Sequence, residues 1–161
     1  MADNLLRLEE LLGDGVRVAF WGHNFHISSS QRDGDIPYAG HHLRQQLGND
    51  YRFIGFSFSH GQMVAMGGNG LIVHEVPLPA RQGSIAELFH AAREPDFIRD
   101  LGALPGSELL DWLRQPQDKR TLGAVVPNEF FPLYWEERVA ERYDAIIHIN
   151  ESTATVPLPA P

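Results

Sequence analysis

Two histidines three positions apart, His23 and His26, follow an apolar run near the start of the chain. The run Val16–Trp21 ends in Gly22, and in open α/β sheets ligands bind beyond the carboxyl ends of the strands. A neutral imidazole, with a pKa of about 6.5, can take a proton from water at neutral pH, while a second polar group orients it or stabilises the developing negative charge. We therefore predict that His23 and His26 are catalytic, without assigning which of them is the base.

Three nearby residues are candidates for substrate binding. Asn24 and Phe25 lie between the two histidines, and His60 follows a second strand-like run. Side chains beyond neighbouring strand ends can line one crevice, although a solvated turn explains His60 equally well. Three further histidines lie within strand or helix patterns and are interpreted as structural: His74, His90 and His148.

A metal site is the main alternative for the histidines. Imidazole is a common zinc ligand, and His23, His26, His41 and His42 all lie in the first third of the chain. On a regular helix His41 and His42 would point about 100° apart, so at most one of them could reach the same ion. We therefore expect neither a metal nor another cofactor.

Composition excludes several classes of site and partner. The chain of 161 residues has no cysteine, which excludes thiolate nucleophiles, and it lacks the Gly-x-Ser-x-Gly elbow of serine hydrolases. A net charge of −8 without a basic cluster argues against nucleic acid as a partner. No apolar run approaches the roughly eighteen residues of a membrane helix, and the N-terminus does not resemble a secretory signal. These features predict a cytoplasmic protein that binds a small molecule, with no membrane partner.

The elements around these residues alternate between helix and strand. Val16–Trp21 shows no polar alternation, so it is predicted to be a strand buried on both faces, as in a parallel sheet. The glycine-rich segment 67–70 predicts an antiparallel hairpin, and Ser84 followed by Glu87 predicts a capped helix. The other predicted elements are the helices Asp3–Leu12, Tyr38–Leu47 and Glu108–Leu113 and the strands Tyr51–Phe58, Phe97–Leu101, Thr121–Val125 and Tyr143–Ile149.

This pattern predicts the fold class. Alternating helices and strands are typical of α/β proteins, in which helices cover the faces of a sheet. We expect helices layered on a mostly parallel sheet that carries one antiparallel hairpin between Met63–Met66 and Leu71–Val76. A chain of this length suits a single domain, here residues 1–161.

Five short segments occur in a characteristic order along the chain: Trp21–His26, Ala39–Leu43, Gly48–Phe56, Tyr143–Ile147 and Glu151–Thr153. Their sequences and spacing resemble the C-terminal portion of the erythromycin esterase family. The resemblance implies hydrolysis of esters, including macrolide lactones in some members, by histidine-activated water. It places His23 and His26 in the pocket, whereas Phe25 stands where many members have glycine.

The resemblance leaves three expectations for function. The first is a hydrolase of small-molecule esters with reduced or no activity, because the family's upstream half, which carries a further catalytic histidine, has no counterpart among these segments. The second is a non-catalytic ligand-binding or assembly module, and the third is one half of a split enzyme. Covering an unpaired sheet edge or apolar face would favour either a homo-oligomer or the missing N-terminal half as a partner.

Overall fold

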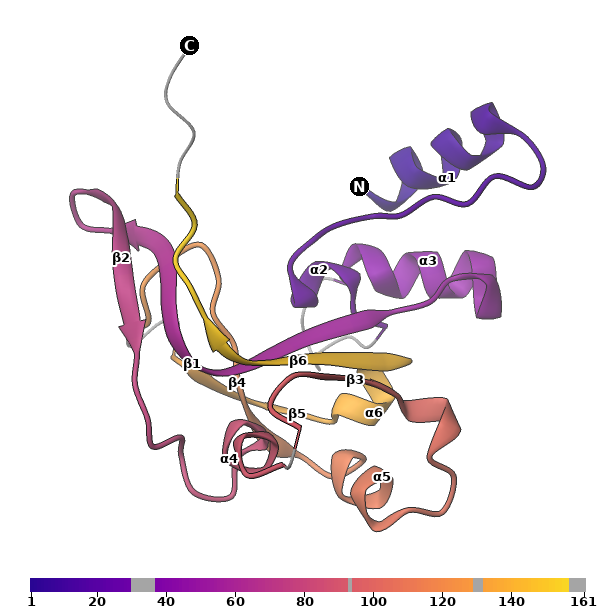
Figure 1. Cartoon of the computed structure of the whole chain (residues 1–161). Coiled ribbons are helices and arrows are strands. Elements are labelled where there is room, and N and C mark those ends of the chain that lie inside the picture. The colour runs from indigo at the N-terminus through magenta and orange to yellow at the C-terminus, as the bar shows by residue number, and fades with distance from the viewer. Residues whose placement is uncertain (30–36, 93, 129–131, 157–161) are drawn as a thin grey trace.

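The computed structural model describes residues 1–29, 37–92, 94–128 and 132–156. Its helices are α1 (Ala2–Leu12), α2 (Asn24–Ile27), α3 (Ala39–Leu47), α4 (Ile85–His90), α5 (Glu108–Leu113) and α6 (Val139–Arg142), with the short 3₁₀ turns η1 (Gly48–Asp50) and η2 (Leu101–Ala103). Its strands are β1 (Ile54–Gly67), β2 (Gly70–Val76), β3 (Phe97–Asp100), β4 (Gln117–Arg120), β5 (Tyr134–Glu137) and β6 (Ala145–Ser152). The architecture is mixed α/β, with α1, α2 and α3 on one side of the main sheet and α4 and α5 on the other (Figure 1).

The main sheet is mixed, and the predicted mostly parallel sheet is wrong. Its strand order is β2-β1-β6-β3, in which β1 and β6 are parallel while β1–β2 and β3–β6 are antiparallel. The strands β4 and β5 form a separate antiparallel pair. The predicted hairpin is confirmed, because β1 and β2 pair from Gly61 and Val76 to Gly67 and Gly70. Strand direction depends on contacts between distant segments, which local patterns do not encode.

β1 is one continuous strand where the sequence predicts two separate pieces. Its first half pairs with β6 and its second half pairs with β2, and the change of partner falls at Gly61. Gly61 has a φ of +114°, and a Cβ there would lie 2.1 Å from the carbonyl oxygen of Ser152. Only glycine fits this position, so Gly61 lets the strand bend past β6 without ending.

Val16–Trp21 is not a strand, contrary to the prediction. The segment has no regular structure and runs along the α1 and α3 side of the sheet (Figure 1). Trp21 is 84% exposed, and Val16 and Val18 are 44% and 41% exposed. A strand needs a ladder partner for its backbone groups, and no strand in the described ranges pairs with this segment. Thr121–Val125 also forms no strand: β4 ends at Arg120, and Val125 makes a single bridge to Met66.

The main core lies between the sheet and α4, α5 and α6. It consists of nine buried side chains: Phe53, Ile85, Phe89, Leu101, Leu110, Leu113, Val139, Tyr143 and Ile146. The predicted cap of α4 is confirmed, because Oγ of Ser84 accepts a hydrogen bond from the backbone N–H of Glu87 at 3.2 Å. The Glu87 carboxylate in turn accepts from the N–H of Gly83 at 2.6 Å. None of the helices in the described part of the chain is long and apolar enough to span a bilayer.

His148 in β6 is buried between two serines of β1. Its Nδ1 lies 2.8 Å from Oγ of Ser57 and its Nε2 lies 3.2 Å from Oγ of Ser59, and the residue is 1% exposed. Burial lowers the pKa of His148 to about 4, an effect that Asp96 opposes and His90 reinforces. The imidazole is therefore neutral in the folded protein at neutral pH.

We expect the protein to lose stability as the pH falls from about 6.5 to about 4. The pKa of His148 is lower in the folded protein than in the unfolded chain, so the unfolded chain binds more protons within this window. The stabilisation is complete above the unfolded pKa and is lost on acidification, which amounts to on the order of 3 kcal/mol. Urea unfolding of the wild type and of His148→Gln at neutral pH and near pH 4 measures this contribution. A parallel fall in both proteins would show that His148 does not titrate in this way.

Candidate functional site

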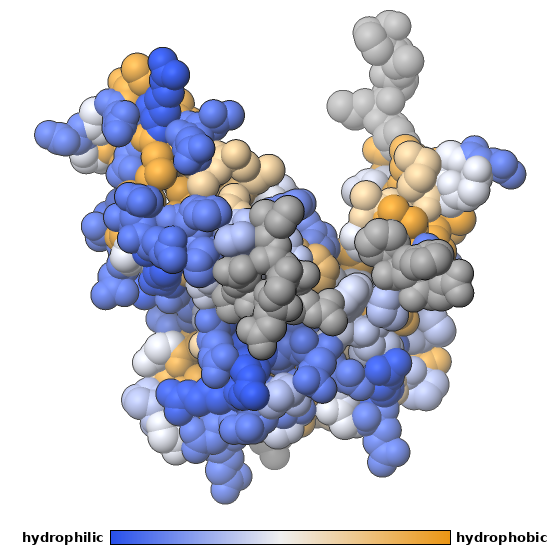
Figure 2. All heavy atoms as spheres, turned by 180° about the vertical axis from the view of Figure 1, so that it is seen from behind, coloured by the Kyte–Doolittle hydropathy of each residue, from blue (hydrophilic) through white to orange (hydrophobic). Residues whose placement is uncertain are grey.

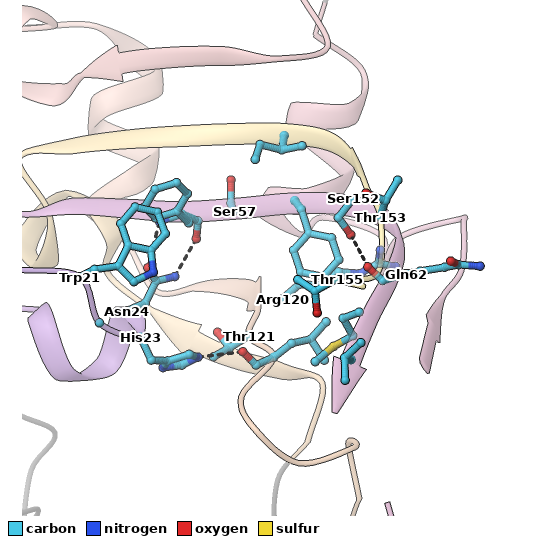
Figure 3. Close-up of a pocket in the computed structure, with 17 residues that line it drawn as sticks. Trp21, His23, Asn24, Ser57, Gln62, Arg120, Thr121, Ser152, Thr153 and Thr155 are labelled. Carbon is cyan, nitrogen blue, oxygen red and sulfur yellow. Dashed lines mark hydrogen bonds between the residues drawn. The ribbon is translucent and has the colours of Figure 1, made fainter. Parts of the chain in front are cut away.

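A cavity of about 410 Å³ lies over one face of β1, between the turn that precedes α2 and the segment that follows β4 (Figure 3). Its wall is largely apolar, with hydroxyl and amide groups distributed around it (Figure 3). The lining residues are Trp21, Gly22, His23, Asn24, Phe56, Ser57, Phe58, Gln62, Met63, Val64, Arg120, Thr121, Leu122, Ile149, Ser152, Thr153 and Thr155.

His23 lines this cavity and caps α2. Its Nδ1 accepts a hydrogen bond from the backbone N–H of Phe25 at 3.3 Å, and its Nε2 lies 2.8 Å from the carbonyl oxygen of Leu122. An N–H can only donate and a carbonyl can only accept, so the imidazole is neutral with its proton on Nε2. Burial lowers the pKa of His23, an effect that the bond to Leu122 opposes. Both ring nitrogens of His23 are thus occupied by hydrogen bonds to the backbone that stabilise the turn.

His26 lies on the other side of the same turn. It is exposed, and it is not among the residues that line the cavity. Its ring centroid lies 6.4 Å from that of His23 and 6.3 Å from that of Tyr38. Within the described ranges, its ring nitrogens form no hydrogen bond, and the side chain faces solvent.

Asn24 ties this turn to the sheet. Its Nδ2 donates to the carbonyl oxygen of Phe56 at 2.7 Å, and its Oδ1 accepts from the N–H of Phe56 at 2.9 Å. β2 pairs with β1 only from Gly61 onward, so the Asn24 amide takes the position that a neighbouring strand would occupy beside Phe56. Asn24 therefore fixes His23 and His26 relative to β1 and also lines the cavity.

The two other predicted binding residues lie away from the cavity lining. Phe25 stacks on Tyr38, with ring centroids 5.9 Å apart and planes at 9°, and meets the edge of Trp135 at 6.0 Å. His60 lies farther along β1, with its ring 5.6 Å from that of His90 and its Nε2 4.0 Å from a carboxylate oxygen of Glu151. The structure thus brings His23 and Asn24 together at the cavity, with His26 and Phe25 on the same turn and His60 elsewhere.

Two features of the cavity lining escape sequence reasoning. Arg120 is 5% exposed, and the carbonyl of Leu122 holds His23. Both follow from the path of β4, whose four residues, Gln-Asp-Lys-Arg, are all polar. No motif marks these residues, because their burial depends on distant segments that pack around them.

The described residues do not contain a group of three or more metal-ligating side chains. His41 and His42 lie on α3, with ring centroids 5.7 Å apart, and Nδ1 of His41 lies 3.1 Å from the carbonyl oxygen of Ser29. This contact gives His41 a structural role between α3 and the turn after α2.

Three solved structures share this fold. A Bacillus cereus protein has a TM-score of 0.73 and 20% identity, with 83% of this chain and 33% of that chain covered. A succinoglycan biosynthesis protein has a TM-score of 0.69 and 21% identity, with 83% and 32% covered. The erythromycin esterase EreC, as a histidine-to-asparagine mutant in its open conformation, has a TM-score of 0.62 and 17% identity, with 93% and 35% covered. The chain therefore spans about a third of the length of each neighbour.

The family follows from the sequence model that matches the chain. The model for erythromycin esterase matches residues 1–152, which is nearly the whole chain and includes the turn with His23 and His26. The resemblance drawn from the five sequence segments is thereby confirmed. This chain belongs to the erythromycin esterase family.

Proposed function

We propose that this chain supplies the histidine turn of a site that hydrolyses small-molecule esters, with His26 as the base that activates water. The contrast between the two histidines carries the proposal. His23 has both ring nitrogens bonded to the backbone, whereas the ring of His26 is exposed and makes no hydrogen bond to the part of the chain that the structure describes. His23 is then a positioning residue, which holds the turn in shape.

In this reaction His26 carries out two proton transfers. Its imidazole takes a proton from water while the water oxygen attacks the ester carbonyl carbon, and it returns that proton to the alkoxide as the carbon–oxygen bond breaks. The products are a carboxylic acid and an alcohol. An imidazole side chain is suited to both steps because it can take up and return a proton near neutral pH.

A second candidate is a role as one part of a larger assembly. The chain spans about a third of its structural neighbours, and apolar side chains stay exposed on two elements. Figure 2 shows these orange patches over α1 and over the β1–β2 hairpin, with a hollow between them. Their members are Leu8, Leu11 and Leu12 on α1 and Leu71, Ile72 and Val73 on β2. A complementary family segment or a second copy of the chain would cover such surfaces.

The proposal is tested by turnover of a panel of activated and macrocyclic esters. We expect His26→Asn to lower kcat at least about a hundredfold, with a change in unfolding free energy below about 0.5 kcal/mol, because the side chain is exposed. His23→Asn keeps a capping side chain but loses the bond to Leu122, so it should lower stability by about 1 kcal/mol.

His42→Asn on the exposed side of α3 is the matched control, and it should leave turnover unchanged. Equal activity of the His26→Asn protein and the wild type would reject His26 as the base. If the wild-type chain binds esters or acids without any turnover, the non-catalytic alternative is supported instead.

A further inference from the structure

Arg120 is the one residue with a fixed charge among the described residues that line the 410 Å³ cavity. It is 5% exposed, and the cavity lining contains neither aspartate nor glutamate. Figure 3 labels Arg120 among the lining residues, together with Thr121, Thr153 and Thr155. The fixed charge in this lining is therefore positive, whereas the chain as a whole has a net charge of −8.

The guanidinium of Arg120 has no carboxylate partner in the described part of the chain. Its Nε donates to the hydroxyl of Tyr134 at 2.6 Å, and its Nη2 donates to the carbonyl of Pro77 at 2.8 Å. Its Nη1 is buried and has no hydrogen-bond partner within the described ranges. A buried cation without a counter-charge is unfavourable, and pairing it with an anion would remove much of that penalty.

Another arginine close in space shows the contrast. Arg81 also contacts Tyr134, but its Nη1 forms an ion pair with Asp118 at 2.9 Å and its side chain is 53% exposed. Arg81 therefore has its counter-charge at the surface, whereas Arg120 is buried and its Nη1 has no hydrogen-bond partner among the described residues. Guanidinium groups match carboxylates geometrically, through paired N–H donors.

We propose that Arg120 makes this cavity a binding site for an organic carboxylate with an apolar body. The apolar body would lie against Trp21, Phe56 and Phe58, and the carboxylate would pair with Nη1 of Arg120. Because Nη1 is shielded in the structure, this pairing requires the guanidinium to turn toward the cavity. This inference rests on the proposed function in one respect: the ligand would be the carboxylic acid that ester hydrolysis releases. Arg120 is then a specificity-determining residue.

Calorimetric titration with 3-phenylpropionate and with its neutral amide tests the inference directly. We expect the wild-type chain to bind the acid at least tenfold more tightly than the amide. Arg120→Gln should remove this preference, whereas Arg81→Gln, which removes a guanidinium from the surface, should preserve it. Binding is measured without any turnover, so the result does not depend on whether His26 acts as a base.

A second variant keeps the test decisive if Arg120→Gln fails to fold. Thr155 lines the cavity and is exposed, so Thr155→Glu adds a negative charge there without removing a buried contact. It should weaken binding of the acid at least tenfold and leave binding of the amide unchanged. Equal affinities for acid and amide in the wild type, or an acid preference that survives Thr155→Glu, would overturn the proposal. Ester turnover that depends on His26 would leave the proposed function standing in either case.

Discussion

Replacing Gly40 with alanine is expected to destabilise the protein by about 3 kcal/mol or more, although the same change inside a helix ordinarily stabilises by up to about 1 kcal/mol. Gly40 is a buried residue in the first turn of α3, where the helix passes the end of α2. A Cβ at this position would lie 2.0 Å from the carbonyl oxygen of Ile27 and 2.5 Å from that of Ser28. These are backbone atoms, so no side-chain rotation relieves the clash.

The clash bears on the candidate site because Ile27 ends the turn that holds His23 and His26. Relieving it requires α3 to move away from α2, which would disturb the bonds of His23. Urea unfolding of Gly40→Ala gives the loss in unfolding free energy. Gly68→Ala is the control, since a Cβ there meets no heavy atom within 4 Å and Gly68 has no positive φ. Similar stability of the two variants would show that α2 and α3 are not in close contact.

Elements with local signals were predictable from the sequence. The cap of α4 by Ser84 and Glu87 and the glycine turn of the β1–β2 hairpin were expected and are present. These signals act over a few residues, since a capping side chain and its target N–H lie within one helical turn. The strand β6 was recognised for a similar reason, because Ala145, Ile146 and Ile147 are consecutive apolar residues. The prediction that the whole run is buried is wrong, since Ile146 is buried but Ile149 is 40% exposed.

Pairing between distant segments was not predictable in the same way. The parallel pairing of β1 with β6 joins residues about 90 positions apart, such as Phe56 and Ile147. No local sequence pattern indicates which strands pair over such a distance. Hydrophobicity alone also misassigned Val16–Trp21. The apolar pattern indicates a segment suited to burial. In the described part of the chain, however, no strand pairs with this segment, and Val16, Val18 and Trp21 stay exposed.

In the candidate site, too, the local motif was predictable from the sequence, whereas the long-range contacts were not. The His-Asn-x-His pattern directed attention to a turn that the structure places at and beside the cavity. The different environments of the two histidines depend on long-range contacts, such as the hydrogen bonds of His23 to Leu122 and of Asn24 to Phe56. His23 is hydrogen-bonded to the backbone, whereas His26 is exposed. Charged residues in β4 and β5 were unremarkable in sequence, yet Lys119 and Glu137 are buried beneath this turn.

Lys119 and Glu137 form an ion pair that is fully enclosed. The Nζ of Lys119 lies 3.7 Å from Oε2 of Glu137, and the residues are 0% and 2% exposed. The hydroxyl of Tyr143 donates to the same carboxylate at 3.4 Å. Burial lowers the pKa of Lys119, and the Glu137 charge opposes this effect. Burial and the Glu137 charge together raise the pKa of Tyr143 well above its usual value.

Glu137→Gln is expected to lower the unfolding free energy by about 3–5 kcal/mol, because it leaves a buried ammonium without its counter-charge. The exposed pair Arg81–Asp118 provides a matched control: its charged atoms are closer, at 2.9 Å, but its side chains are 53% and 37% exposed. Asp118→Asn should therefore change stability by less than about 1 kcal/mol. Burial, rather than distance, decides which of the two ion pairs matters more.

The pH dependence of Glu137→Gln identifies the cause of its instability. Without Glu137, burial lowers the pKa of Lys119 further from its usual value of 10.5. Between that lowered pKa and 10.5, the unfolded chain binds more protons than the folded protein. The stability of the variant should therefore rise with pH towards 10.5, and adding Lys119→Met should abolish the rise and recover stability. If the single variant is as stable as Asp118→Asn and shows no such rise, Lys119 is not a buried cation that depends on Glu137.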